Sequence, residues 1–373
     1  MTGPRDLNSQ IESLINRLRR RQVVGSWSVS LETALLLRQV VSTSRWNQVG
    51  TLINLVKDVG RRLVLAQPRE LAVGNIVRRV LRLIREVYNS EVGTTAAFHK
   101  ASTAESGNGK SIFQQTRTHD LHDGSAGSST GTNFFSSSSS MINLLNVKSA
   151  SMDYNRKNFN ILHSDTYHVL EMINELEIMY ANIADQAMEH IHSNEIIMTV
   201  GKSHTVEVFL KTAAKKRKFT VVVAETSPTY LGHQMALSLS QAGIDTTVIS
   251  DSAIFAVMSR VNKVIMGTHA VLANGGLISV SGAQMVATAA KHHSTPVVVC
   301  TGLYKLSPLY PYDEDSFNDL VAPDPVLSFE EGELIDKVTL LNPYYDYVSP
   351  ELVNLFITNT LINENYDPED TVI

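Results

Sequence analysis

Apolar residues recur at helical spacings through the first hundred positions of the chain. The earlier members of this pattern are Leu14, Leu18, Leu31, Leu35 and Leu36. A second stripe consists of Ile76, Val80, Leu83, Ile84 and Val87, with arginines among the positions between. Such spacing puts the apolar side chains on one face of each helix, where they need a packing partner. Residues 5–97 are therefore predicted to be helical, with Ser30 as an N-cap and Pro68 between two of the helices.

Residues 101–150 interrupt this pattern. The segment holds 12 serines, including the run from Ser136 to Ser140. Such a composition cannot bury enough apolar surface to order itself. Helical periodicity resumes at Phe159 and continues to Met188. We therefore predict a disordered insertion at about 101–150 inside an N-terminal helical domain that spans residues 1–192.

From Glu195 onwards, short β-branched runs alternate with helical segments. The predicted strands are 196–200, 220–223, 246–249, 264–266 and 296–299. The helices between them include 205–216, 232–242 and 283–292. Strands that are apolar throughout and alternate with helices are typical of a parallel sheet covered on both faces. Residues 193–373 are thus predicted to form a Rossmann-like, doubly wound α/β domain with its ligand site at the carboxyl ends of the strands.

Charge is divided unevenly along the chain. Residues 1–98 carry 15 Lys and Arg against 7 Asp and Glu, a balance of +8, whereas residues 301–373 carry 2 against 15, a balance of −13. This asymmetry indicates charged partners or contacts between chains. The single cysteine, Cys300, excludes an internal disulfide framework. No secretory signal and no stretch of about 18 apolar residues is found, so the sequence predicts a cytoplasmic protein without a membrane partner.

Several short motifs admit both a functional and a structural interpretation. Gly201-Lys202-Ser203 resembles the end of a phosphate-binding P-loop, but Ile196 occupies the place of that loop's first glycine. What remains is a turn between a strand and a helix, whose free N–H groups are able to receive an anion. A plain turn is the favoured interpretation. Glu225 follows a predicted strand and is either a functional carboxylate or a helix cap.

The histidines and arginines give weaker signals. Neither histidine pair, 190 with 192 or 292 with 293, shares a helix face, and no metal site is predicted. The arginine-rich helical face includes Arg78, Arg79, Arg82 and Arg85. No RNA-binding signature or interleaved aromatic platform accompanies it, and direct nucleic-acid binding is not expected. A solvated face is favoured, with an acidic protein partner second and RNA third.

Longer motifs resemble a known family. A resemblance to the regulatory subunits of translation initiation factor 2B rests on 185–191, 196–199, 259–267 and 272–275. A resemblance to the beta subunits in particular rests on 291–296, 313–317, 321–323 and 342–348. The resemblance is dense over 158–360, looser over the N-terminal helices and absent from the serine-rich segment.

These subunits are similar in fold to isomerases that act on methylthioribose phosphate and ribose bisphosphate. The isomerases carry a catalytic cysteine where this sequence has Gly201, and a catalytic aspartate where it has His269. Their phosphate-binding Glu-Thr-Arg-Pro segment reads Glu225-Thr226-Ser227-Pro228 here. Glycine cannot act as a general acid or base, and serine lacks the guanidinium that holds phosphate with two hydrogen bonds.

The resemblance therefore implies a relic pocket with no catalytic residue and no cofactor, in which ligand binding is left open. Its residues are Gly201, Lys202, Ser203, Glu225, Thr226, Ser227, His269, Asn274 and Gly275. Sugar-phosphate isomerase activity remains as the disfavoured alternative.

The function implied by the resemblance is that of a non-catalytic regulatory subunit in the guanine-nucleotide exchange factor for translation initiation factor two. The expected partners are the alpha, delta, gamma and epsilon subunits of that exchange factor. A further expected partner is the alpha subunit of factor two, whose serine phosphorylation the regulatory core senses. The candidate partner surfaces are the four arginines named above and Tyr344, Tyr345 and Tyr347, because tyrosines bury area while keeping a polar group.

Overall fold

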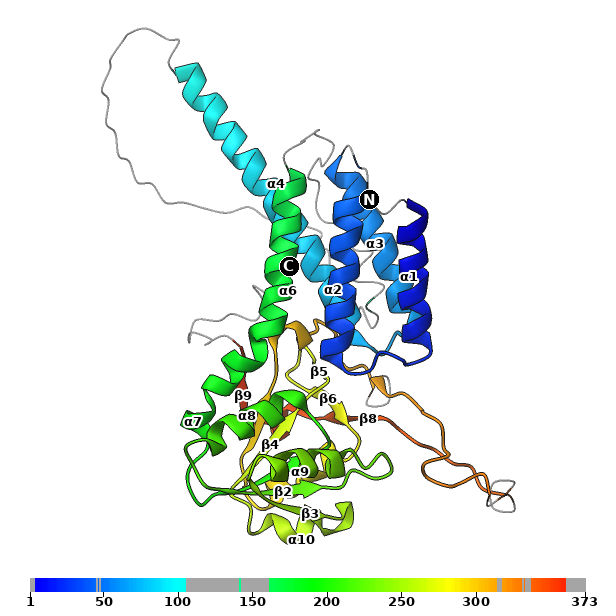
Figure 1. Ribbon diagram of the computed structural model, residues 1–373, viewed down its shortest axis with the longest axis vertical. Coiled ribbons are helices and arrows are strands. Elements are labelled where there is room, and N and C mark those ends of the chain that lie inside the picture. Colours follow the sequence, from blue (N-terminus) through cyan, green and yellow to red (C-terminus); the bar gives the residue numbers. More distant parts are fainter. Residues whose placement is uncertain are drawn as a thin grey trace, which may run out of the picture.

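Helices form the first part of the molecule and an alternation of strands and helices forms the second (Figure 1). The structure is a computed structural model that describes residues 4–44, 46, 48–104, 141, 161–313, 317–330, 332 and 337–359. Of the predicted insertion, residues 101–104 end a helix and Met141 is buried beside Gly74. The rest of residues 101–150 lies outside the described residues.

The long helices of the first part pack along one another through the predicted apolar stripes. They are α1 (Pro4–Arg19), α2 (Ser26–Thr43), α3 (Val49–Ala66), α4 (Leu71–Ala104) and α6 (Ile161–Asp185). In α4, Ile76, Val80 and Ile84 are almost completely buried. Pro68 lies between α3 and α4, as predicted. Within the described ranges, no helix is long and apolar enough to cross a membrane.

The start of α2 differs from the prediction. Gly25 precedes the helix with a φ of 92°, in the region that favours glycine, and the helix begins at Ser26. Trp27 donates its indole N–H to the carbonyl of Leu176 on α6 at 3.0 Å. Ser30 is buried inside α2 and is not its cap. Packing of the first turn against α6 therefore begins the helix five residues earlier than the capping pattern predicts.

A six-stranded parallel sheet follows the short helix α7 (Ala187–His190). In spatial order its strands are β3 (Asp245–Ile249), β2 (Thr220–Ala224), β1 (Ile196–Val200), β4 (Lys263–Gly267), β7 (Val297–Cys300) and β9 (Leu355–Ile357). All neighbouring pairs are parallel. The five predicted strands are confirmed. The sixth, β9, was not predicted, because it has three residues and Leu355 is exposed.

Helices cover both faces of the sheet. Alternate side chains of the strands join α8 (His204–Ala214) and α9 (Leu231–Gln241) in one hydrophobic cluster. The other face packs on α10 (Ile254–Met258) and α11 (Ala283–His292). The cluster on the α8 and α9 side continues into the long helices of the first part. The predicted fold class, helices followed by a doubly wound sheet, is confirmed, while a domain boundary at residue 192 stays a prediction.

A small antiparallel sheet lies beside the main sheet and was not predicted. Its strands are β5 (Ala270–Val271), β6 (Leu277–Val280) and β8 (Tyr345–Val348), in the order β5-β6-β8. Between the short 3-10 turn η2 (Leu303–Lys305) and β8, the chain runs away from the body of the molecule and returns, drawn in orange in Figure 1. The return brings Tyr345 back to the end of β4, where the candidate site lies.

Candidate functional site

The loops that follow β1, β2 and β4 meet at the carboxyl edge of the sheet. Gly201 follows β1, Thr226 lies two residues after β2, and His269 lies two residues after β4. The amide of Gly201 donates to Oγ1 of Thr226 at 2.9 Å. Because β1 lies between β2 and β4, the structure brings these predicted residues to the edge where doubly wound folds bind ligands.

Gly201 occupies a position that has little room for a side chain. Its φ is 65°, in the left-handed region. A Cβ atom there would lie 2.9 Å from Cγ1 of Val280 on β6. A cysteine at this position would therefore combine backbone strain with a steric clash. The local backbone therefore favours glycine at this position. Glycine has no side chain that could act where the isomerases have their catalytic cysteine.

Lys202, Ser203 and Glu225 engage nearby helices. Ser203 is the N-cap of α8 and packs its hydroxyl against Gly267 at the end of β4. The ammonium of Lys202 donates a hydrogen bond to Oε1 of Gln234 on α9 at 3.2 Å. The carboxylate of Glu225 lies 3.7 Å from the ring of His233, also on α9. These three residues thus act as structural contacts around the carboxyl edge.

The backbone amides of the loop after β2 already donate hydrogen bonds within the chain. The backbone N–H groups of Thr226 and Ser227 donate to the two carboxylate oxygens of Asp251, at 3.0 and 2.7 Å. Asp251 begins the 3-10 turn η1 (Asp251–Ala253) that follows β3. An internal carboxylate therefore satisfies the amides that an anionic ligand would otherwise use. Sequence analysis did not assign this role to Asp251.

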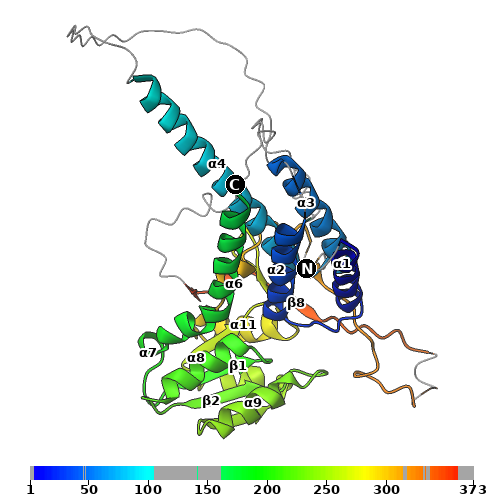
Figure 2. The same cartoon turned by 45° about the horizontal axis from the view of Figure 1, so that its top comes forward.

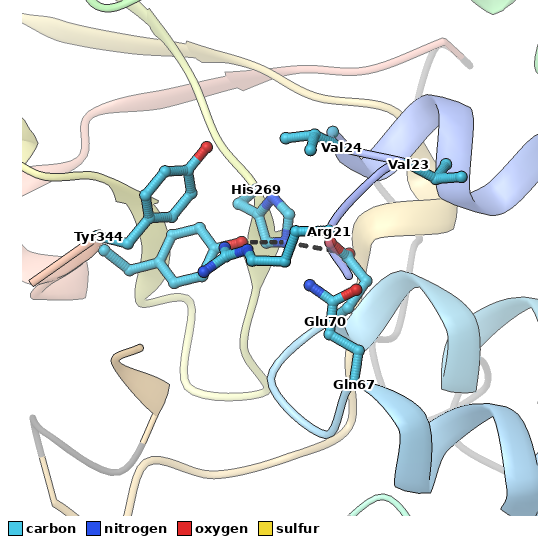
Figure 3. A pocket seen from close by; sticks show the side chains of 9 residues that line it. Arg21, Val23, Val24, Gln67, Glu70, His269 and Tyr344 are labelled. Atoms are coloured by element: carbon cyan, nitrogen blue, oxygen red, sulfur yellow. Dashed lines mark hydrogen bonds and ion pairs between the residues drawn. The ribbon is translucent and has the colours of Figure 1, made fainter. Parts of the chain in front are cut away.

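His269 points toward the helical part of the molecule (Figure 3). Its Nε2 lies 3.0 Å from Oε1 of Glu70, at the start of α4, and 3.1 Å from the hydroxyl of Tyr345. The side chain of His269 is 12% exposed and that of Glu70 is 3% exposed. The structure therefore turns the residue at the second catalytic position into a link between the sheet and the helices.

Asn274 and Gly275 shape the turn between β5 and β6. The side-chain amide of Asn274 donates to the hydroxyl of Tyr347 at 2.8 Å, and its carbonyl accepts from the amide of Gly276. Gly275 has a φ of 81°, which the turn requires. Asn274 thus joins the turn to β8, and neither residue contacts Gly201 or His269 among the interactions of the described residues.

The three tyrosines predicted as a partner surface contact their own chain. Tyr345 is buried against His269. The guanidinium of Arg21 lies 4.6 Å from the ring centre of Tyr344. Tyr347 accepts the hydrogen bond from Asn274. Within this chain β8 is paired in the small sheet and the ring of Tyr345 is buried, while partner binding by the three tyrosines stays a prediction.

A buried lysine completes the link between sheet and helices. Lys305, on η2, is 6% exposed and donates its ammonium to the carbonyl of Thr268 at 2.7 Å. Burial lowers its pKa to about 8, although the nearby Glu70 carboxylate acts in the opposite direction. Burial also raises the pKa of the phenols of Tyr304 and Tyr345. Sequence analysis missed Glu70 and Lys305, although Lys305 is one of only two basic residues in 301–373.

The cavity beside His269 is small. Its volume is about 30 Å³, and it is lined by Arg21, Val23, Val24, Gly25, Gln67, Glu70, His269, Tyr344 and Tyr345 (Figure 3). A volume of this size holds roughly two water molecules. Pockets for small organic ligands are usually about 300–1,000 Å³. The cavity is therefore too small for a sugar phosphate.

The four predicted arginines of α4 divide into two pairs. Arg79 forms an ion pair with Glu175 of α6, and Arg82 pairs with Glu86 at 2.6 Å. Arg78 and Arg85 are half-buried. Across the described part of the chain, no group of three or more His, Cys, Asp or Glu side chains is arranged to hold a metal ion.

Comparison with known proteins places this geometry in a family. Residues 22–363 match the model of the Initiation factor 2 subunit family. The chain is 48% identical to the beta subunit of translation initiation factor eIF2B from Schizosaccharomyces pombe over 393 aligned positions, covering 97% of each chain. In structure it resembles the beta subunit of eIF2B from Chaetomium thermophilum, with 30% identity, a TM-score of 0.63, and coverage of 95% of this chain and 85% of that one.

A chain in the tetrameric eIF2B beta2-delta2 complex of C. thermophilum also matches, with 30% identity, a TM-score of 0.63, and coverage of 95% and 90%. The sequence motifs, the helical part and the doubly wound sheet all agree with these matches. The chain therefore belongs to the initiation factor 2 subunit family, and its similarity to beta subunits of translation initiation factor 2B extends over nearly its whole length.

Proposed function

We propose that this chain is a non-catalytic regulatory subunit of the guanine-nucleotide exchange factor for translation initiation factor two. In this role it assembles with the delta subunit, and through it with the alpha, gamma and epsilon subunits. The assembled core binds the alpha subunit of factor two and senses its serine phosphorylation. The observation that carries the proposal is the 48% identity to a beta subunit over 97% of both chains.

The geometry of the carboxyl edge supports a role without catalysis. Moving a proton between adjacent carbons needs an acid and a base near both carbons. Gly201 supplies neither, and His269 is engaged by Glu70 and Tyr345. We expect no turnover of methylthioribose 1-phosphate or ribose 1,5-bisphosphate in a coupled isomerase assay. Turnover that is lost on His269→Ala would contradict the non-catalytic role.

An exposed excursion of the chain supports assembly with a partner subunit. We define the acidic arm as the described residues 310–313, 317–330 and 337–343. Its exposed apolar side chains include Tyr310, Tyr312, Leu320, Phe329 and Leu341, each at least 60% exposed. Residues 310–343 also carry nine Asp and Glu against one Lys. Large apolar side chains on a projecting segment are typical of a protein–protein contact, and the charge favours a partner surface with a basic rim.

Assembly is tested by co-expressing the full chain with the delta subunit of the same exchange factor. We expect the two to co-purify at equal stoichiometry. A double variant in the acidic arm, Tyr312→Ser with Phe329→Ser, is expected to lose the delta subunit. The matched control is Leu237→Ser, which removes a side chain 62% exposed on α9, outside the arm. Full retention of the delta subunit by the arm variant would contradict the role of the arm, whereas failure of the unaltered chain to bind would contradict the proposed assembly.

The contact with factor two is proposed to use the exposed arginines of α4. Arg79 and Arg82 are 36% and 48% exposed and their ion pairs lie at the surface, where pairs are weak and exchangeable. Arg79→Glu with Arg82→Glu is expected to weaken binding of the alpha subunit of factor two at low salt. Unchanged affinity at low salt, in a variant that still assembles, would exclude this surface.

A further inference from the structure

Four basic side chains lie along the contact between α3 and α4. Lys57 and Arg61 are one turn apart on α3, and Arg78 and Arg85 are two turns apart on α4. A short connection joins the two helices, which therefore run in opposite directions and lie next to each other (Figure 2). We call these four residues the basic seam.

The packing of the helices sets the order of residues along the seam. A Cβ atom at Gly60 would lie 2.5 Å from Cγ1 of Val77, so the helices touch at these positions. Arg61 and Arg78, the next residues along, therefore flank the same contact. Lys57 lies one turn earlier on α3, beside the later turns of α4 that carry Arg85. This order agrees with the electrostatic coupling of Lys57 to both Arg85 and Arg61, and of Arg78 to Arg85.

The positive charge of the seam is hardly neutralised. Among the described residues, the only ion pair made by a member of the seam joins Arg61 to Asp58 at 3.6 Å, and Asp58 is 62% exposed. By contrast, Arg79 and Arg82 on the same helix each pair with a glutamate. Within the described ranges, the two outer arginines of α4 are thus paired, whereas Arg78 and Arg85 of the seam have no acidic partner.

Two donors in the seam are buried without an acceptor. The Nε atoms of Arg61 and Arg85 are inaccessible to solvent and have no hydrogen-bond partner within the part of the chain that the structure describes. A buried donor without an acceptor costs free energy, which an acceptor bound in the seam would return. Burial lowers the pKa of Lys57, and the charges of Arg85 and Arg61 lower it further. Burial and the charge of Arg85 lower the pKa of Arg78 in the same way. The four cationic side chains therefore repel one another in a half-buried position. A bound anion would attract all of them and so offset this repulsion.

We propose that the basic seam formed by Lys57, Arg61, Arg78 and Arg85 is a binding site for a phosphate group. A phosphate monoester carries up to two negative charges and three acceptor oxygens, and therefore suits several cations and unpartnered N–H donors better than a single carboxylate does. The phosphate belongs either to a small molecule or to a phosphorylated side chain. The site does not depend on the proposed function, because its test needs no partner protein.

The first test measures phosphate binding by the full chain. Thermal unfolding and isothermal titration calorimetry are carried out in phosphate-free buffer with increasing inorganic phosphate, with chloride keeping the ionic strength constant. We expect saturable binding and a rise in Tm. The variants Lys57→Gln and Arg85→Gln are expected to bind at least tenfold more weakly. Arg62→Gln is the matched control, because it removes an arginine of α3 that is paired with Glu12, and it is expected to bind as the unaltered chain does.

A second readout separates a binding site from a structural role. Without phosphate, Lys57→Gln and Arg85→Gln are expected to unfold at the same temperature as the unaltered chain or a higher one, because each removes repulsion. Arginines that merely stabilise the fold would give a lower Tm on substitution. No phosphate binding by the unaltered chain, equal binding by Arg85→Gln, or an equal loss in Arg62→Gln would overturn the proposal.

The source of the phosphate is distinguished with a second probe. N-acetyl-phosphoserine amide is titrated beside inorganic phosphate, with N-acetyl-serine amide as the control. Binding more than tenfold tighter than that of inorganic phosphate would support a phosphorylated side chain as the ligand. Equal affinities would support a small phosphorylated molecule. Binding of the unphosphorylated control with the same affinity would overturn the assignment to phosphate.

Discussion

Replacement of Lys305 by methionine probes the buried link between sheet and helices. Lys305 is buried with its ammonium on the carbonyl of Thr268, and its pKa falls from 10.5 to about 8 in the native protein. Burial is the larger cause, and Glu70 opposes it. Because the native pKa lies below the unfolded one, the unfolded chain binds more protons than the native protein between about pH 8 and 10.5. The contribution of this residue to stability therefore rises with pH in that window.

The size of the effect follows from the two pKa values. A tenfold change in proton affinity corresponds to about 1.4 kcal/mol. Keeping Lys305 charged in the native state therefore costs about 3 kcal/mol at pH 7.5. At pH 9.5 the native lysine is mostly neutral and the cost falls to about 1 kcal/mol. Lys305→Met removes this dependence, so its free energy of unfolding relative to that of the unaltered chain should fall by about 2 kcal/mol between these pH values.

The assay is urea unfolding of both proteins at pH 7.5, 8.5 and 9.5, monitored by tryptophan fluorescence. The comparison between variants removes the contributions of Cys300, Tyr304 and Tyr345, whose pKa values burial raises in both proteins. The control is Lys291→Met, which removes an exposed ammonium and one positive charge. A stability difference for Lys305→Met that stays constant with pH would refute the account of the buried charge.

Three further substitutions test the fold around the site. Gly201→Ala should lower the free energy of unfolding by about 1–2 kcal/mol, because its backbone is left-handed and Val280 is close; an unchanged urea midpoint would show that the loop has room for a side chain. Phe209→Ala removes a fully buried ring and should cost about 3–5 kcal/mol in the same assay. The pKa of Glu207 is lowered, since hydrogen bonds from Lys211 and Ser238 outweigh burial, so Glu207→Gln should reduce Tm at pH 7. That loss should shrink as the pH falls below about 4.5, and a pH-independent loss would contradict the assignment.

The main sheet was predictable because its strands are short, apolar and evenly spaced. The predicted runs 196–200 and 220–223 correspond to β1 and β2, and 283–292 corresponds to α11. The small sheet was not predictable, since β5 has only two residues and β6 pairs with β8, which begins 65 residues after β6 ends. Local patterns carry no information about such long-range pairing.

The site was predictable in position but not in contacts. Sequence motifs placed Gly201, Thr226 and His269 at the carboxyl edge, where the structure has them. The partners of His269 come from elsewhere: Glu70 from the start of α4 and Tyr345 from β8. Their role depends on burial between the sheet and the helices, which composition and periodicity do not report. In the sequence, Glu70 lies two residues after Pro68 and Tyr345 lies near an acidic segment, and neither pattern distinguishes them from ordinary surface residues.

The most direct test of the proposed function is the binding of the alpha subunit of factor two to the assembled pair of this chain with the delta subunit. Affinity is measured for the phosphorylated and unphosphorylated forms, with each subunit alone as a control. The account predicts binding that requires this chain and differs between the two forms. A well-folded pair that binds neither form would contradict the regulatory role and leave only a role in assembly.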